Sequence, residues 1–350
     1  MSDFFSSIGL PEIVAATLVL ALNAYVLMAG ADFGGGVWDL IASGPRREAQ
    51  RALIAESIGP IWEANHVWLI VVVVVLFTAF PDAFGALGVV LHIPITIMLV
   101  GIVLRGSAFM FRSYGSRSHQ GRHHWGRAFA SASVVTPLLL GVIVGAISSG
   151  AVGRAASSPM AGSFVDVYVH PWAAPFPLAV GGFTVSIFAF LAAVYLTVAT
   201  THDGLRDDFR ERALWAAVAL LVFAGLSLIL AHWGAPRVAA GITGSPWSVV
   251  LHLATGVAAA TAILGLWRRQ YAIARIAAAA QVTLILWGWA LSEYPYLLPS
   301  TMTIRDAAAP RITLELLLIG LAGGAVILVP SLRYLLRNFA SRPADSSRLS

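Results

Sequence analysis

Long apolar runs separated by short polar segments dominate the chain. Each run approaches the ~20 residues that an α-helix needs to cross a hydrocarbon core about 30 Å thick. We identify nine such runs, at residues 8–31, 58–80, 84–111, 125–148, 173–200, 213–233, 248–267, 271–291 and 314–336. The pattern predicts an all-α, polytopic membrane protein with about nine transmembrane helices. We expect two four-helix bundles plus one peripheral helix, in a single integral membrane domain over residues 1–350.

The first apolar run ends in Ala29-Gly30-Ala31, which resembles the small-residue cleavage site of a signal peptide. A secretory signal, however, has a positively charged segment before a short apolar run. Here the residues before the run carry only Asp3, and the first basic cluster follows the run. We therefore expect this run to be retained as the first helix.

Arginine residues are unequally divided between the two sets of loops. The loops after helices one, three, five and seven, together with the C-terminal tail, hold 17 of the 22 basic residues, whereas the opposite loops hold four. The remaining one, Arg105, lies within the third apolar run. Because basic loops stay in the cytoplasm, the distribution predicts an N-terminus outside and a C-terminus in the cytoplasm.

Composition supports a membrane location and excludes several chemistries. Of the 350 residues, 58% are hydrophobic and 11% are charged, whereas soluble domains are about 25% charged. Every basic residue is arginine, and these residues lie in loops between apolar runs, so we expect no nucleic-acid partner. The absence of cysteine excludes disulfides, thiolate metal sites and covalent c-type haem attachment within the chain.

Ionisable side chains inside apolar runs are costly, so they often mark functional positions. Asp32 is the first of them, and three glycines, Gly34, Gly35 and Gly36, follow it. Glycines allow a backbone or a cofactor to approach closely, and they weaken a helix. We expect this segment to be the cytoplasmic end of helix one, with Asp39 further out at the membrane interface.

The second polar segment surrounds Glu63, at the start of the second predicted helix, where Pro60 suits the first turn. Glu63 and His66 are three residues apart and share one helix face; Asn65 and Trp68 share the neighbouring face. Burial shifts the proton affinities of carboxyl and imidazole groups toward neutral pH. The segment thus favours a role in proton transfer. The alternative is that Glu63 and His66 only satisfy each other's polar groups within a helix interface.

Other polar residues give weaker indications. A haem with two His ligands would need two facing His residues from a set that includes His66, His92, His232 and His252, but lone helical His residues more often only pack or form hydrogen bonds. We interpret His119, His123 and His124, surrounded by arginines, as part of a basic loop rather than a metal site. Glu293 is compatible with a functional site near the outer surface and equally with an ordinary position at the membrane interface.

Two motifs resemble subunit II of cytochrome bd-type quinol oxidases. The first is Gly30-Ala31-Asp32-Phe33-Gly34-Gly35-Gly36 followed by Gly59-Pro60-Ile61-Trp62-Glu63-Ala64-Asn65-His66-Val67-Trp68-Leu69. The second is Tyr294-Pro295-Tyr296-Leu297-Leu298-Pro299-Ser300 with the residues that follow it to Leu314. Glu63 stands where other members have Asp, and His66 where they have Gln, which is similar to the cyanide-insensitive branch.

The resemblance implies a role in a terminal oxidase of the bacterial cytoplasmic membrane. Such a complex oxidises quinol and reduces O2 to water, with haem b and haem d ligated by the partner subunit I. This chain would then bind no cofactor or metal itself. The implied partners are subunit I in a heterodimer, a small accessory subunit, membrane lipid, quinol and O2.

The resemblance also assigns roles to residues of this chain. Asp32, Glu63 and His66 would form a cytoplasmic-side path for protons, and the chain would also help to conduct oxygen. Around them, the predicted lining consists of Trp62, Asn65, Trp68, Gly34, Gly35 and Gly36.

Three other functions remain open from the residues alone. A secondary transporter would also combine intramembrane carboxylates with glycine-weakened helices. A self-sufficient b-type cytochrome would use its own His residues, such as His66, His92 or His252. If the chain were a purely structural accessory subunit, the complex would need neither Asp32 nor Glu63 for turnover.

Overall fold

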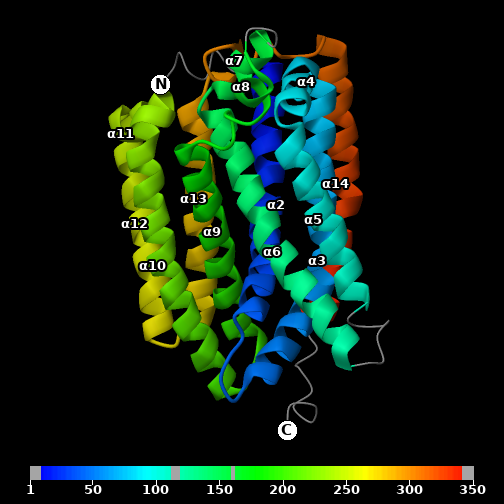
Figure 1. Ribbon diagram of the computed structural model, residues 1–350, viewed down its shortest axis with the longest axis vertical. Helices are drawn as coiled ribbons and strands as arrows, with labels where there is room; N and C mark the ends of the chain where they lie inside the picture. Colours follow the sequence, from blue (N-terminus) through cyan, green and yellow to red (C-terminus); the bar gives the residue numbers. More distant parts are fainter. Residues whose placement is uncertain (1–8, 112–118, 159–161, 341–350) are drawn as a thin grey trace.

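The structure, a computed structural model, describes residues 9–111, 119–158 and 162–340, without the side chains of residues 58–61, 63, 119–123 and 335–340. It is almost entirely helical (Figure 1). The first half of the described chain contains α2 (Leu10–Leu40), α3 (Arg47–Ala79), α4 (Pro81–Val90), α5 (His92–Met110), α6 (His119–Ser148), α7 (Ala151–Ser157) and α8 (Phe164–Tyr168). The second half contains α9 (Pro175–Ala199), α10 (Asp203–Gly234), α11 (Pro236–Gly244), α12 (Pro246–Trp267), α13 (Tyr271–Glu293), β1 (Tyr296–Leu298), β2 (Met302–Thr303) and α14 (Arg311–Ala340).

The predicted membrane architecture is confirmed. Within the described residues, eight helices are long and apolar enough to cross a membrane, and the bent pair Ala64–Ala79 and Pro81–Val90 adds a ninth if it counts as one span. The axes of this pair differ by 115°. The chain therefore turns back at Phe80, and α4 leads directly into α5 (Figure 1).

The helices form two bundles and one peripheral helix. The first bundle consists of α2, α3, α5 and α6, and the second of α9, α10, α12 and α13. The two bundles meet where α9 packs against α2 and α6. Helix α14 contacts α3 and α2 along one side and leaves most of its surface exposed, so it is the peripheral helix.

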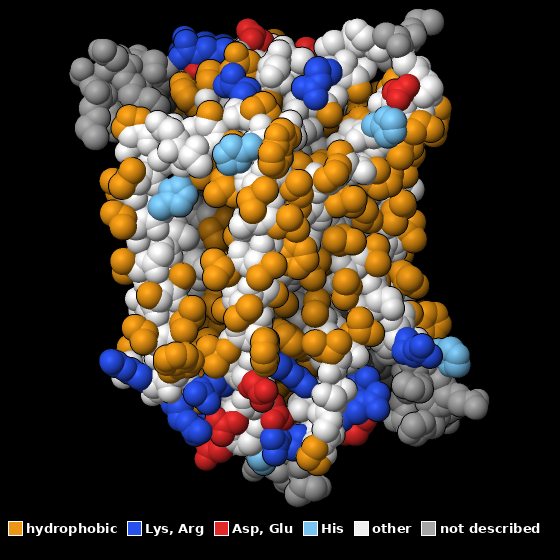
Figure 2. Space-filling view, turned by 60° about the vertical axis from the view of Figure 1, so that its left-hand side comes forward, with side chains coloured by type: hydrophobic (Ala, Val, Ile, Leu, Met, Phe, Trp, Pro, Cys, Tyr) orange, Lys and Arg blue, Asp and Glu red, His pale blue; other side chains and the backbone are white. Residues whose placement is uncertain are grey.

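The outer surface of the bundle is apolar in the middle and charged at both ends. Figure 2 shows the belt of hydrophobic side chains, with charged side chains above and below it. Phe77, Val103, Leu221 and Ile327 are among the large apolar side chains that stay exposed. Such a belt would be unfavourable in water, and it fits a hydrocarbon environment.

Three helices extend beyond their predicted limits at the same end of the molecule. Helix α2 continues to Leu40 rather than ending at residue 31, α3 begins at Arg47 rather than at residue 58, and α10 begins at Asp203 rather than at residue 213. The extensions of α3 and α10 are amphipathic, that of α2 is mostly buried, and each buries apolar side chains, among them Trp38, Leu53 and Phe209. An apolar-run criterion misses them because they carry the charged residues of this end.

The position of Pro60 is a related correction. The sequence suggested that Pro60 starts the second helix, but the helix already begins at Arg47. Pro60 therefore lies inside α3, where proline removes one backbone hydrogen bond. The helix continues through it to Ala79.

The opposite end, which we call the hairpin end, contains α4, α7, α8, α11 and the antiparallel pair β1–β2 (Figure 1). Two contacts fasten the hairpin to the first bundle. The backbone N–H of Ala309 donates to the carbonyl of Ala79 at 2.8 Å, and Arg305 forms an ion pair with Glu12. The pKa of Arg305 is raised above its usual range by the hydrogen bond to Glu12.

Candidate functional site

A buried ion pair lies in the centre of the first bundle. Arg105 of α5 forms a bidentate contact with Asp32 of α2, with 2.6 Å between Nη2 and Oδ1 and 3.0 Å between Nη1 and Oδ2. The Arg105 side chain is 1% exposed and that of Asp32 is fully buried. Two opposite charges therefore face each other at a depth where neither reaches water.

Further contacts engage two more donors of Arg105. Nη2 donates to the backbone carbonyl of Asp32 at 2.8 Å, and Nε donates to Ser133 Oγ of α6 at 2.9 Å. The guanidinium carbon lies 4.6 Å from the ring centroid of Phe33 and 4.7 Å from that of Phe129. Because hydrogen bonds and aromatic faces surround it, the cation is stabilised without solvent.

Asn65 brings the fourth helix, α3, to the same point. Its Nδ2 donates to Asp32 Oδ2 at 3.4 Å, and the side chain is fully buried. A carboxylate only accepts, so this contact fixes the amide orientation. Asn65 Oδ1 then has no hydrogen-bond donor among the described residues. We call Asp32, Arg105, Ser133 and Asn65 the ion-pair cluster.

On a neighbouring face of α3, His66 and Trp62 line an open groove against α5. The groove has a volume of about 440 Å³, and Gly106 and Phe111 lie on its α5 side. His66 Nδ1 is 2.7 Å from the carbonyl oxygen of Trp62. A carbonyl can only accept, so Nδ1 carries the hydrogen, and Nε2 of the neutral ring retains a free lone pair that can take up a proton.

Gly106 makes room for this arrangement. A Cβ atom there would lie 3.1 Å from Trp62 Cζ2, which is tight for a rigid ring. The Trp62 ring meets the His66 ring edge-on, with 5.5 Å between the centroids. The indole thus holds the imidazole at the groove.

The remaining predicted residues of α3 have different outcomes. The backbone of Glu63 belongs to α3, one residue after Trp62, but its side chain lies outside the described residues. Trp68 packs against the main apolar core of the two bundles. Asn65 therefore joins the buried cluster, His66 and Trp62 line the groove, and Trp68 serves packing.

The glycine segment after Asp32 allows two helices to approach α2. A Cβ atom on Gly34 would lie 1.9 Å from the carbonyl oxygen of Phe188 in α9, and one on Gly36 would lie 2.1 Å from Ser133 Oγ in α6. The predicted close backbone approach is confirmed, and the neighbours are helices. The glycines do not end the helix, since Gly34, Gly35 and Gly36 all lie buried within α2.

Asp39 differs from the expectation of an interfacial residue. It is 2% exposed, and Arg51 Nε lies 3.7 Å from its Oδ1. The helical extension of α3 covers it, so the side chain is removed from water although it lies beyond the apolar run. The burial of Asp39 results from the amphipathic first turns of α3, which pack over it.

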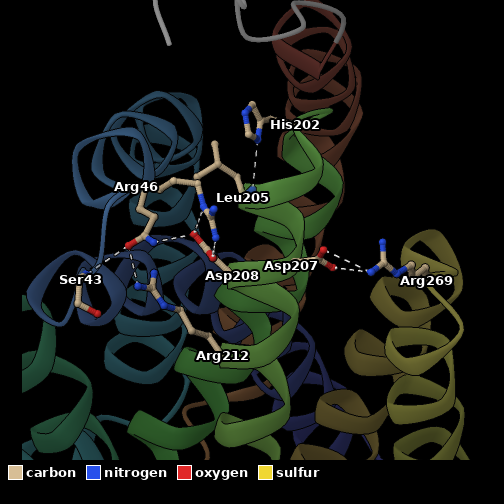
Figure 3. A network of polar contacts seen from close by, with 9 residues as sticks. Ser43, Arg46, His202, Leu205, Asp207, Asp208, Arg212 and Arg269 are labelled. Atoms are coloured by element: carbon tan, nitrogen blue, oxygen red, sulfur yellow. Dashed lines mark hydrogen bonds and ion pairs between the residues drawn. The ribbon is translucent and has the colours of Figure 1, made fainter. Parts of the chain in front are cut away.

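A polar network joins the start of α3 to α10 (Figure 3). Arg46 forms a bidentate contact with Asp208, which also accepts from Gln50 Nε2 at 2.8 Å. Gln50 Oε1 accepts from Arg212 Nη2 at 2.7 Å. We call Arg46, Gln50, Asp208 and Arg212 the α3–α10 clamp, and the end of the molecule that holds it the clamp end.

The clamp links the two bundles at the end nearest the ion-pair cluster. The Arg212 guanidinium lies 5.7 Å from the ring centroid of Trp38, and Trp38 Nε1 donates to the carbonyl of Ala189 in α9 at 2.8 Å. The pKa of Arg46 is raised above its usual range by its hydrogen bond to Asp208. The clamp thereby fixes the extension of α3 that leads to Glu63.

The described His residues do not form a haem pocket with two His ligands. The groove between α3 and α5 contains His66 as its single imidazole, and a second groove, at the hairpin end, contains none. His232 and His252 each direct Nδ1 to a carbonyl of their own helix, and His92 directs Nδ1 to the carbonyl of Val89 at the end of α4. The side chains of His119 and His123 lie outside the described residues.

Sequence reasoning missed the role of Arg105. The sequence shows Arg105 inside the third apolar run, as the one basic residue outside the two sets of loops, but it does not show a partner for it. An ionisable side chain in an apolar run is as costly for Arg105 as for Asp32. Two opposite charges buried in different helices indicate that they form a pair. The chain positions 32 and 105 alone, however, do not show that α2 and α5 face each other.

Comparison with known proteins gives a consistent result. Residues 10–339 match the family model described as cytochrome bd terminal oxidase subunit II. Cytochrome bd ubiquinol oxidase subunit 2 of Bacillus subtilis is 28% identical over 207 residues, which are 58% of this chain and 58% of that protein. Cytochrome bd-I ubiquinol oxidase subunit 2 of Escherichia coli is 26% identical over 216 residues, 61% of this chain and 55% of that protein.

The fold of the whole chain also matches a solved structure. A chain of the bd oxidase from Geobacillus thermodenitrificans superposes with a TM-score of 0.78 at 24% identity, covering 95% of this chain and 99% of that chain. The sequence alignments span a little over half the length of the two curated relatives. The family match, by contrast, extends over nearly all described residues, and the chain belongs to the cytochrome bd terminal oxidase subunit II family.

Proposed function

We propose that this chain is subunit II of a quinol:oxygen oxidoreductase of the bacterial cytoplasmic membrane, and that it supplies a proton path from the cytoplasm. The observation that carries the proposal is the groove between α3 and α5, where His66 lies beside the buried ion-pair cluster within an apolar bundle. Family membership supports the oxidase assignment.

Glu63 and His66 are the proposed proton carriers. His66 offers a free Nε2 at the groove, and Glu63 is three residues before it on α3. Asn65, between them in sequence, presents an unpaired and buried Oδ1. A protonated carboxyl group or a water molecule can donate a hydrogen bond to that oxygen, so Asn65 can orient a proton donor without carrying the proton itself.

Asp32 has a different proposed role from the one suggested by the resemblance. Protonation of Asp32 would leave Arg105 unpaired and buried, which costs about 3–5 kcal/mol in comparable cases. We assign Asp32 and Arg105 as a fixed ion pair that holds α2, α5 and α6 around Asn65. Proton transfer then uses Glu63 and His66.

The haems and the quinol belong to the partner in this proposal. The described residues do not fit a haem with two His ligands, so we derive no step of the reaction from a haem in this chain. When bound to subunit I, haem supplies the electron transfer and the reduction of O2. This chain contributes the bundle that packs beside it and the polar residues that deliver protons.

The proposal is tested by expressing the chain with its subunit I and, separately, alone. Reduced-minus-oxidised visible spectra and quinol-driven oxygen uptake are then recorded for each preparation. The proposal predicts haem bands and oxygen uptake only with the partner. Haem bound to this chain alone would instead favour a self-sufficient cytochrome, and a failure to bind any subunit I would favour a transporter.

A further inference from the structure

A second buried carboxyl group lies at the hairpin end, far from the ion-pair cluster. Glu293 is the last residue of α13, immediately before the β1–β2 hairpin. Figure 1 shows this end of α13 opposite to the clamp end. Glu293 is therefore separate from the proposed path through Glu63.

Glu293 is enclosed by parts of several elements. Its exposed fraction is 7%, and Ser148 of α6 and Trp289 of α13 lie beside the carboxyl group. Helix α11 closes one side, because a Cβ atom on Gly241 would lie 2.8 Å from the Cβ of the neighbouring Ser292. The first strand of the hairpin begins three residues after Glu293, at Tyr296.

Neither carboxyl oxygen forms a hydrogen bond of normal geometry among the described residues, although Ser148 and Trp289 lie close enough to interact weakly with the carboxyl group. The indole N–H of Trp289 and the hydroxyl of Ser292 donate to other groups. Trp289 Nε1 donates to Ser148 Oγ at 2.8 Å, and Ser292 Oγ donates to the carbonyl of Trp289 at 2.7 Å. Glu293 thus differs from Asp32, whose oxygens receive three side-chain hydrogen bonds.

One charged side chain acts on Glu293 from α11. Arg237 interacts with it electrostatically, but its guanidinium carbon lies 4.1 Å from the ring centroid of Tyr296, over the hairpin. Among the described residues the two form no ion pair, so the attraction acts over a distance. From α6 and α13, the groups beside the carboxyl are the neutral Ser148 and Trp289.

A lone carboxylate in such surroundings is costly, because its lost hydration is not replaced by donors. The neutral acid loses much less hydration and needs only one acceptor for its own hydrogen. We propose that Glu293 is a proton-binding site and that its carboxyl group holds a proton in the folded protein. Tyr294, the next residue, is 36% exposed at the hairpin end.

Infrared spectroscopy of the purified complex tests this proposal without relying on turnover. A protonated carboxyl group has a C=O stretch that is distinct from the carboxylate bands and shifts in D2O. Spectra are compared at neutral pH for the wild type, Glu293→Gln and the matched control Glu315→Gln. Glu315 is an exposed residue at the same end, paired with Arg311 at 2.7 Å.

The proposal predicts that Glu293→Gln removes one protonated-carboxyl band that Glu315→Gln retains. If the Glu293→Gln protein does not fold, Glu293→Asp provides the second variant, and its band should move in frequency but persist. A neutral-pH spectrum in which Glu293→Gln removes only carboxylate absorption would overturn the proposal. The proposal does not require that either variant lose quinol oxidase activity.

Discussion

Arg105 Nη2 lies 2.6 Å from Asp32 Oδ1, inside a bundle where neither side chain reaches solvent. These residues are 73 positions apart and belong to α5 and α2. The ion pair therefore fixes the relative position of two helices that the chain does not connect directly. Ser133 and Asn65 add α6 and α3, so one polar cluster joins all four helices of the first bundle.

Removal of one member of this pair should strongly destabilise the protein. We expect Asp32→Asn or Arg105→Met to lower the free energy of unfolding by about 3–5 kcal/mol, because each leaves a buried group unpaired. The double variant should recover part of this loss, since no lone charge remains. Thermal unfolding of the purified complex measures both effects.

The control for this prediction is the exposed ion pair between Arg311 and Glu315. Arg311→Gln should change stability by less than about 1 kcal/mol. If Asp32→Asn is as mild as this control, the ion pair does not hold the bundle together.

The close contact between α2 and α9 depends on Gly34. A Cβ atom there would lie 1.9 Å from the Phe188 carbonyl oxygen, so Gly34→Ala must push the helices apart. We expect a loss of about 1–3 kcal/mol or more, as for other overpacked interiors. Gly225→Ala is the matched control, because no atom lies within 4 Å of a Cβ placed at that helical glycine. Equal stability of the two variants would contradict the packing described.

The α3–α10 clamp should contribute a smaller and salt-dependent stabilisation. Arg46 is 44% exposed and Asp208 is 17% exposed, so solvent screens their attraction. We expect Asp208→Asn to cost on the order of 1 kcal/mol at low ionic strength and less at high salt. Melting temperatures in low and high salt check this. A loss that is independent of salt would show that the clamp acts mainly through packing.

His66 should matter for turnover through its Nε2 atom. His66→Phe retains a ring against Trp62 but removes the proton-accepting nitrogen, so we expect a clear decrease in quinol-driven oxygen uptake with little change in stability. His92→Phe is the control, because His92 is an exposed residue at the start of α5. If the complexes with His66→Phe and with His92→Phe both take up oxygen at the wild-type rate, His66 has no role in proton transfer.

Much of the fold could be predicted from the sequence because lipid imposes a simple rule on helix length. The apolar runs identified the helices, and the cost of buried charge selected Asp32. The helical extensions at Arg47 and Asp203 were missed because they lie outside the apolar runs and follow an amphipathic pattern.

The candidate site was only partly accessible to sequence reasoning. The spacing of Asn65 and His66 put them on different faces of α3, and the structure agrees: Asn65 joins the cluster and His66 lines the groove. The partner of Asp32 could not be derived in this way. Gly36 lets α6 approach α2 and place Ser133 beside the guanidinium group of Arg105, which no sequence spacing shows.

The most direct test of the proposed proton path is the rate of quinol-driven oxygen uptake by the complex with Glu63→Gln. Glu56→Gln, an exposed carboxylate on the same helix, is the matched control, and haem spectra confirm that each complex assembles. We predict that Glu63→Gln assembles fully but loses most of its oxygen uptake, whereas Glu63→Asp and Glu56→Gln retain it. Full oxygen uptake by an assembled Glu63→Gln complex would contradict the account and leave the chain a structural role.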